Sequence, residues 1–405
     1  MSRLARRLTT FDATVIGVGS MVGAGIFAAV SPAATAAGTW VLAGLAIAAA
    51  VAFANATSSA QLAALYPESG GTYVYARRRL GTYWSFLAGW AFVVGKIASL
   101  SVMALTFGSY VHAPTARPLG VAAVVALTIV NVGGIRKTAR TTLVIVVLVL
   151  VALAAVVVAS LDGASSANLS SEAPSGPLGV LRSAGLLFFA FAGYARVATL
   201  GEEVISPRTA IPRAIVASLA IVVVVYAIVI ASALAAVGPD VLARSPAPLT
   251  AAAGAGWAGV VRAGAAIASL GVMLSLLAGV SRTVLSMARE RDLPGLLDRV
   301  HVRFRTPYLA DIAVAAVVCT LVTFADLADA LGASSFAVLG YYALTGASAW
   351  TLGAEQRLWP RWLSGAAVVS CVVLAFSLPP VSVVGGLIVL GAGSLVWLGR
   401  QHRLR

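Results

Sequence analysis

The chain alternates long apolar runs with short polar connections. A bilayer crossing takes about 20 apolar residues, and twelve runs bounded by charged or turn-forming residues approach that length. The runs are Phe11 to Ala37, Trp40 to Leu65, Tyr83 to Val111, Leu119 to Gly133, Thr141 to Leu161, Leu181 to Leu200, Ile211 to Val237, Ala258 to Ser281, Leu309 to Ala325, Ala330 to Leu352, Trp362 to Leu378 and Val381 to Leu398. This pattern predicts an all-α polytopic membrane protein with 12 transmembrane helices in one domain, residues 1–405.

Composition supports this prediction. Of the 405 residues, 60% are hydrophobic and 10% are charged, whereas soluble globular proteins carry roughly 25% charged residues. A soluble enzyme is therefore excluded. The basic residues before the first run also suit a signal peptide, but eleven further runs and the glycines inside the first favour a retained helix.

Basic residues are distributed unevenly between the two sets of loops. The loops on the side of the N-terminus hold 22 of the 28 Lys and Arg residues, the opposite loops hold four, and Lys96 and Arg196 remain at membrane depth. By the positive-inside rule, both termini are cytoplasmic in a multi-pass protein of the cell membrane. The net charge of +14 is thus explained by basic residues in the cytoplasmic loops, next to the lipid bilayer. No nucleic-acid partner is expected.

Two runs five positions apart are interrupted by glycine. The first contains GVGSMVGAGIF, residues 17–27, and the sixth contains LLFFAFAGYARVATLGEE, residues 186–203. Gly19 and Gly23 in the first run also suit close packing against another helix, which is the alternative role of these glycines. Because five runs is an odd number, the two broken helices are antiparallel, which is typical of transporters with inverted repeats. Free N–H groups of Ala24, Gly25 and Ile26 would then suit a substrate carboxylate.

Five motifs in order make the chain resemble the amino acid/polyamine/organocation superfamily. They are GVGSMVGAGIF, LYPESGGTYVYARRRLG, NVGGIRKTART, FFAFAGYARVATLGEEVISPRTAIPRAI and SRTVLSMARERDLP. The resemblance implies a five-plus-five inverted repeat of the leucine-transporter type with helices 1 and 6 broken. Residues 11–161 and 178–352 would form the repeats, and residues 362–398 a peripheral helix pair.

The resemblance also implies the residues that line the substrate. Helix one would contribute Ser20, Met21, Gly23, Ala24 and Gly25, and helix six would contribute Phe189, Ala192 and Gly193. An aromatic residue at the position of Phe189 commonly gates the substrate in this family. Phe188, Phe189 and Phe191 cannot all face a cavity, so packing in the core is the alternative role. Ser334 and Ser335 in helix ten are further candidates, and their hydroxyls could equally bond the helix itself.

Coupling residues are harder to assign. Many proton-coupled relatives place a lysine in helix five, but the run Thr141 to Leu161 has no ionisable group. Lys96, near the middle of the third run, costs roughly 2.5 to 3.5 kcal/mol to insert, and no Asp or Glu is expected deep within any run to pair with it. We therefore expect Lys96 to face the cavity and exchange a proton. Ser281 could offer an oxygen to sodium, but the adjacent charge of Arg282 disfavours sodium coupling.

Arg196, Glu202 and Arg282 are further candidates for coupling or gating. Arg196 follows the break in helix six, and Glu202 lies at its cytoplasmic end near Arg208 and Arg213. A structural ion pair that closes the cytoplasmic side is the alternative to a proton role for Glu202.

The leading interpretation is a secondary active transporter of an amino acid or related amine-bearing metabolite, working by alternating access with proton-coupled uptake. A substrate/product antiporter of the same fold is the alternative. A channel or a non-transporting receptor is a further alternative. A channel would need a continuous polar lining, but the runs hold very few polar side chains. A receptor would need an output domain, which these 405 residues do not provide. No catalytic residues, cofactor or metal are expected, and Cys319 and Cys371 lie in apolar runs as small core residues.

Overall fold

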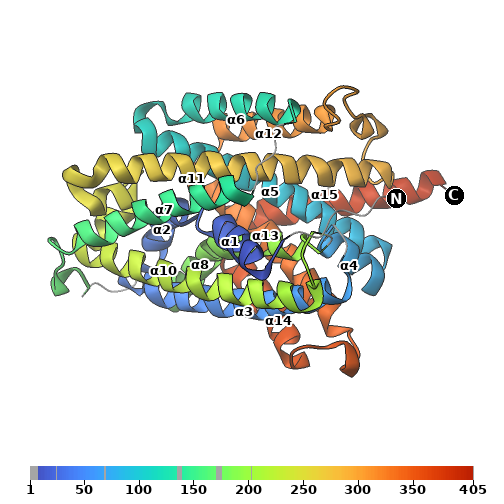
Figure 1. The fold of residues 1–405 in the computed structure, drawn as a ribbon, viewed down its shortest axis with the longest axis horizontal. Helices are drawn as coiled ribbons and strands as arrows, with labels where there is room; N and C mark the ends of the chain where they lie inside the picture. Colours follow the sequence, from blue (N-terminus) through green and yellow to red (C-terminus); the bar gives the residue numbers. More distant parts are fainter. Residues whose placement is uncertain are drawn as a thin grey trace.

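The computed structural model describes residues 8–23, 25–67, 70–134, 139–169, 176–201 and 203–404. These residues form an elongated bundle whose long helices run mostly along one axis (Figure 1). The α-helices are α1 (Thr10–Met21), α2 (Gly25–Ala37), α3 (Val41–Leu65), α4 (Thr72–Arg79), α5 (Thr82–His112), α6 (Ala116–Val132), α7 (Ala139–Ser160), α8 (Gly176–Phe191), α9 (Ala195–Ala198), α10 (Pro207–Arg244), α11 (Pro248–Arg289), α12 (Tyr308–Phe324), α13 (Leu327–Trp350), α14 (Arg361–Ser377) and α15 (Pro380–Leu404). The 3-10 helices are η1 (Gly38–Trp40), η2 (Ala113–Thr115), η3 (Ser166–Leu169), η4 (Ala192–Tyr194), η5 (Gly295–Asp298) and η6 (Ala354–Gln356).

The predicted all-α class is confirmed for the part of the chain that the structure describes. Outside the helices it contains only one isolated bridge, between Leu8 and Val204. Among the described residues, eight helical stretches are long and apolar enough to cross a membrane, and two of these, residues 25–65 and 82–132, each cover two predicted runs in whole or in part. The shorter apolar helices α12 and α14 coincide with two further runs. The chain is therefore a multi-pass membrane protein.

Glycine and proline extend two helices beyond their predicted bounds. At Gly238, φ is 74°, and Pro239 follows, so α10 bends sharply and continues to Arg244. Gly254 has φ 66° and bends α11 near its start at Pro248. A positive φ is readily adopted by glycine because it has no Cβ. The predicted connection between Val237 and Ala258 is thus mostly helical, folded back at two glycines.

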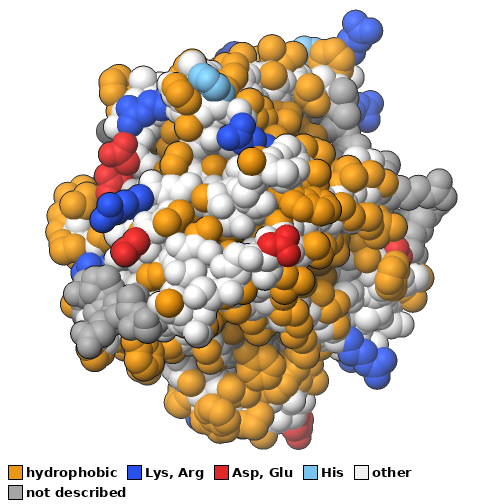
Figure 2. All heavy atoms as spheres, turned by 90° about the vertical axis from the view of Figure 1, so that its left-hand side faces the viewer, with side chains coloured by type: hydrophobic (Ala, Val, Ile, Leu, Met, Phe, Trp, Pro, Cys, Tyr) orange, Lys and Arg blue, Asp and Glu red, His pale blue; other side chains and the backbone are white. Residues whose placement is uncertain are grey.

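The two ends of the bundle differ. α4 and the end of α15 lie at the same end of the molecule (Figure 1). Figure 2 looks onto the opposite end, where charged side chains are scattered among many apolar ones.

The interrupted helices lie inside the bundle. α8 packs against α2, α3 and α13, and α1 packs against α7 and α10. α14 packs on α13 and α3, while α15 packs on α13 and α5. The interruptions in α1–α2 and α8–α9 are therefore surrounded by other helices, where free backbone groups are tolerated within a membrane protein.

One acidic residue near the end of a run is buried. Asp311, in the first turn of α12, is fully buried, and the sequence did not predict this burial. It is the third residue of its run, and such a residue would normally lie at the membrane surface. Here α6 and α11 pack on α12 and cover the carboxyl group.

Candidate functional site

The first interruption lies where the sequence predicts it. α1 ends at Met21, with the N–H of Val22 donating to the carbonyl of Val18, and the next helix starts at Gly25. Ala24 lies outside the described residues. The first N–H groups of a helix have no partner within that helix, so the amides of Gly25 and Ile26 at the start of α2 suit an anionic group.

The second interruption also falls at the predicted residues. α8 ends at Phe191, η4 covers Ala192–Tyr194, and α9 continues to Ala198. A 3-10 segment inside a longer helix leaves some carbonyls without their usual partner. Sequence reasoning therefore located both interruptions to within one or two residues.

The two interruptions touch each other through backbone atoms. A Cβ at Gly193 would overlap the carbonyl group of Ser20 and come within 2.8 Å of the amide nitrogen of Met21. A Cβ at Gly25 would come within 2.8 Å of the Cα of Ala190 on α8. These glycines are required for close approach of backbones, so Gly193 and Gly25 bring the two broken helices together.

Two other candidates from the first helix are engaged elsewhere. The Ser20 hydroxyl donates to the carbonyl of Ile16 in its own helix, at 2.7 Å. Gly23 faces the side chain of Val272 on α11. Met21 is buried in the same cluster as Ile26 and Phe189. Backbone groups, rather than the Ser20 hydroxyl, are thus the polar part of this site.

Tyrosine side chains from neighbouring helices bind the carbonyls at both interruptions. The hydroxyl of Tyr226 on α10 donates to the carbonyl of Met21, and the carbonyl of Ala190 lies 3.3 Å from it. The hydroxyl of Tyr342 on α13 donates to the carbonyl of Ala192 at 2.6 Å. Sequence reasoning missed both residues. The available signal was a tyrosine within an apolar run, because a buried phenol needs a hydrogen-bond partner.

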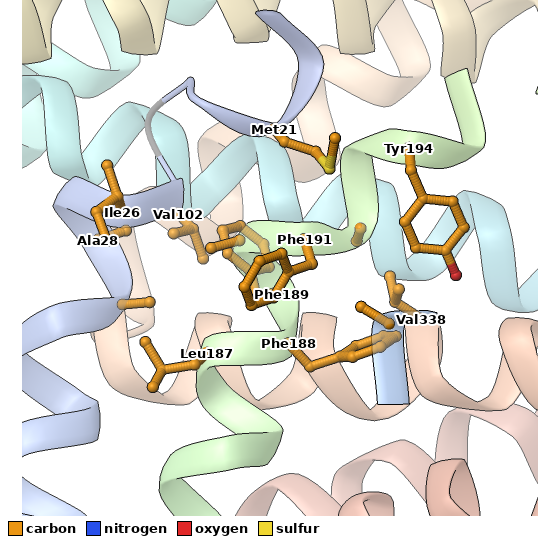
Figure 3. Close-up of a cluster of buried hydrophobic side chains, with 14 of the residues drawn as sticks. Met21, Ile26, Ala28, Val102, Leu187, Phe188, Phe189, Phe191, Tyr194 and Val338 are labelled. Carbon is orange, nitrogen blue, oxygen red and sulfur yellow. The ribbon is translucent and has the colours of Figure 1, made fainter. Parts of the chain in front are cut away.

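The three phenylalanines of α8 have different surroundings (Figure 3). Phe188 packs edge-on against Tyr342, with ring centroids 5.6 Å apart, and Phe191 lies 5.3 Å from the ring of Tyr226. Both are completely buried, whereas Phe189 is 8% exposed. Phe188 and Phe191 therefore hold the tyrosines in place, and Phe189 is the phenylalanine of this run that retains some access.

Two hydroxyl groups, one on η4 and one on α13, are buried without hydrogen bonds to any described residue. Within the described part of the chain, the Tyr194 hydroxyl and the Ser335 hydroxyl are buried without a hydrogen-bond partner. The ring of Tyr194 stacks on that of Tyr342 at 5.0 Å. Ser334 instead bonds Ser99 on α5 at 2.7 Å. Buried polar atoms usually have partners, so Tyr194 and Ser335 are available to a bound molecule.

Of the charged candidates, Arg196 lies on α9, directly after the second interruption, while Lys96 lies on α5 and Arg282 on α11. Lys96 on α5 is half-buried and makes no hydrogen bond or ion pair with any described residue. Arg196 is exposed and donates to the hydroxyl of Thr199 at 3.2 Å. Arg282 is exposed and lies within electrostatic range of Arg196. Glu202 lies outside the described residues.

Comparison with known proteins gives consistent results. A family model described as "Amino acid permease" matches residues 8–394. An uncharacterized transporter of Mycobacterium tuberculosis is 55% identical over 396 residues, which cover 96% of this chain and 90% of that protein. A branched-chain amino acid permease of Bacillus subtilis is 27% identical, covering 98% and 94%. A methylthioribose transporter of Bacillus subtilis is 32% identical, covering 75% and 72%.

Proposed function

Because the chain belongs to the amino acid permease family and is a transporter rather than an enzyme, we propose that it moves an amino acid or related amine-bearing metabolite across the cell membrane by alternating access. The proposal includes twelve crossings, with residues 11–161 and 178–352 as inverted repeats and residues 362–398 as a peripheral pair. Both termini would be cytoplasmic, which is supported by the split of 22 against four basic residues and the positive-inside rule.

The single observation that carries the proposal is the contact between the two interruptions. Gly193 lies against the backbone of Ser20 and Met21, so the free amides of α2 and the 3-10 turn of η4 share one region inside the bundle. In transporters with inverted repeats, substrate sites lie between such broken helices near the bilayer midplane. A single site there, reached alternately from either side, is what alternating access requires.

We place the substrate carboxylate on the amides of Gly25 and Ile26, and the substrate side chain beside Phe189. The described surroundings are strongly apolar, because Ile26, Val102 and Phe189 belong to one buried cluster (Figure 3). An apolar side chain gains about 25 cal/mol for each Å² that it buries there. This environment favours an apolar amino acid, in keeping with the name of the branched-chain permease from Bacillus subtilis.

The proposal also includes proton coupling, and Lys96 is the residue proposed to bind and release the proton. A lysine without a partner inside the membrane is expensive to keep charged, so binding and release of a proton at Lys96 can accompany the change of access. Symport of substrate with a proton follows from such a device. An antiporter of the same fold would exchange substrate for product and would not need Lys96 to change its protonation state.

A screen of the purified protein for ligand stabilisation tests the substrate class. A ligand that binds only the folded state raises stability in proportion to the logarithm of its concentration over Kd. We expect leucine, isoleucine or valine to raise the unfolding temperature, and their decarboxylated amines to fail, because the amines lack the carboxylate. Stabilisation by the amines alone would contradict the proposed carboxylate site.

A further inference from the structure

Asp311 is a buried acidic residue that the proposed transport site does not use. Its relative exposure is 0%, and it lies in the first turn of α12, where α6 and α11 pack against that helix. Burying a carboxylate without compensating partners is costly. An ionisable residue inside a membrane-spanning segment is therefore a functional candidate by default.

The surroundings of Asp311 are polar but incompletely paired. The side-chain amide of Asn131, at the end of α6, donates to Asp311 Oδ1 at 2.7 Å. The hydroxyl of Ser281 on α11 faces the same carboxyl group. Within the described residues, neither Ser281 Oγ nor Asp311 Oδ2 makes a hydrogen bond of good geometry. Ser281 Oγ and Asp311 Oδ2 are thus two buried polar atoms that face each other, and the surrounding hydrogen bonds do not fix which of them is the donor.

This set of partners suits both protonation states of the carboxyl group. A serine hydroxyl can donate or accept, and an asparagine amide nitrogen only donates. When Asp311 is ionised, Ser281 can donate to Oδ2; when it is protonated, its O–H can donate to Ser281 Oγ. In either state Asn131 continues to donate to Oδ1. The site can therefore gain or lose a proton without leaving a buried group unpaired.

One charge is available to balance the ionised form. Arg282, next to Ser281 on α11, is the charged group of the described chain that acts on Asp311. α6 contributes no charge at its Asn131 end within the described residues, and Lys96 on the neighbouring α5 is not among the groups that act on Asp311. η5 also packs against α12, and its Asp298 pairs with Arg289. Arg282 makes no ion pair with Asp311 within 4.0 Å and is exposed. The positive charge of Arg282 therefore acts on the carboxyl group of Asp311 without forming an ion pair with it.

We infer that Asp311, with Asn131 and Ser281, forms an exchangeable proton-binding site at the start of α12. The proton leaves the Oδ2 oxygen for water and returns from it, and Arg282 balances the negative charge that remains. The role in transport rests on the proposed function, in which a proton accompanies the substrate. Asp311 would then be a second proton-binding residue, on α12 rather than on α5 with Lys96.

Infrared titration of the purified protein tests proton binding independently of transport. Wild type should show the carbonyl stretch of a protonated carboxylic acid at low pH, and this band should disappear as pH rises. Asp311→Asn should remove the band. Asp329→Asn is the matched control, because Asp329 also lies in the first turn of a helix but is exposed, and it should retain the Asp311 band.

Ser281→Ala provides a variant that keeps the acid and tests the pairing. It should retain the band but change the pH at which half of it is lost, because the carboxyl group loses its hydroxyl partner. A wild-type spectrum with no band that Asp311→Asn removes would overturn the inference. So would a band that sodium ions abolish at constant pH, because the site would then bind a metal cation.

Transport measurements separate this inference from the proposed function. If the protein carries amino acids, Asp311→Asn should keep substrate exchange and lose at least about tenfold, or 1.4 kcal/mol, of proton-driven accumulation. Unchanged accumulation would remove Asp311 from coupling even if the infrared band is present. If no amino acid is carried at all, the proposed function fails while the infrared result still decides whether Asp311 binds a proton.

Discussion

Gly193 in the second interruption lies directly against the peptide carbonyl of Ser20 at the end of α1, so that even a methyl group at position 193 would overlap it. Two helices far apart in the sequence thus meet through their backbones at the points where both are broken. Such contact fixes the free amides of α2 relative to η4. A rigid arrangement of polar backbone groups binds a carboxylate without requiring a charged side chain.

Replacing Gly193 by alanine should separate the two interruptions. The added Cβ would meet the backbone of Ser20 and Met21, and overpacking of this kind costs about 1 to 3 kcal/mol. We expect a lower unfolding temperature and loss of uptake. Gly279→Ala on α11 is the control, because a Cβ there meets no atom within 4 Å and alanine favours a helix by about 0.5 to 1 kcal/mol. Equal behaviour of the two variants would argue against the contact.

Truncation of Phe189 should weaken substrate binding rather than folding. Phe189 retains slight exposure beside the proposed site, whereas Phe188 packs against Tyr342. Phe189→Ala should raise KM roughly tenfold, equivalent to about 1.4 kcal/mol, with a modest change in stability. Phe188→Ala should mainly destabilise the protein, by about 3 to 5 kcal/mol for a buried phenylalanine. The assignment of Phe189 fails if its removal leaves KM unchanged.

The hydroxyl of Tyr226 should matter more than a hydroxyl at the periphery. Tyr226→Phe removes the donor to the carbonyl of Met21 and leaves a buried acceptor unpaired, which costs about 1 to 3 kcal/mol. Tyr83→Phe removes a hydroxyl that bonds Ser394 on α15 at 3.0 Å and serves as the matched control. We expect reduced substrate affinity for the Tyr226 variant alone. A comparable loss of affinity in the Tyr83 variant would show that the effect is not specific to the interruption.

Neutralising Lys96 should uncouple transport from the proton gradient. Lys96 has no ion-pair partner among the described residues, so Lys96→Met removes a charge without leaving another one unpaired. Uptake driven by an imposed pH gradient should disappear, while exchange of substrate across the membrane should continue. Accumulation with the wild-type dependence on pH and on the gradient would exclude a coupling role for this lysine.

The helices and their interruptions were predictable because they depend on local sequence. Apolar runs predict α-helices since a membrane requires every backbone group to be paired internally, and glycines in the first and sixth runs marked the breaks at Gly25 and Gly193. The bends at Gly238 and Gly254 were not predicted, because their effect depends on a positive φ that a lone glycine in a sequence does not reveal.

Partners across helices were not predictable from one sequence. Tyr226 and Tyr342 bind carbonyls that become free only where other helices break. Asp311 was overlooked because a residue near the end of a run normally reaches the membrane surface, and its burial depends on how α6 and α11 cover it. Helical periodicity places a side chain on a face but does not identify the helix that this face meets.

Counterflow in proteoliposomes shows whether the protein carries an amino acid through one alternately exposed site. Vesicles containing the purified protein are loaded with unlabelled leucine, isoleucine or valine and diluted into a trace of the labelled amino acid. A carrier with one alternately exposed site should concentrate the label transiently above equilibrium, with saturable kinetics that Phe189→Ala weakens. Label that only equilibrates, at a rate proportional to its concentration, would contradict alternating access through one site. Label that never enters, for any amino acid tested, would contradict amino acid transport.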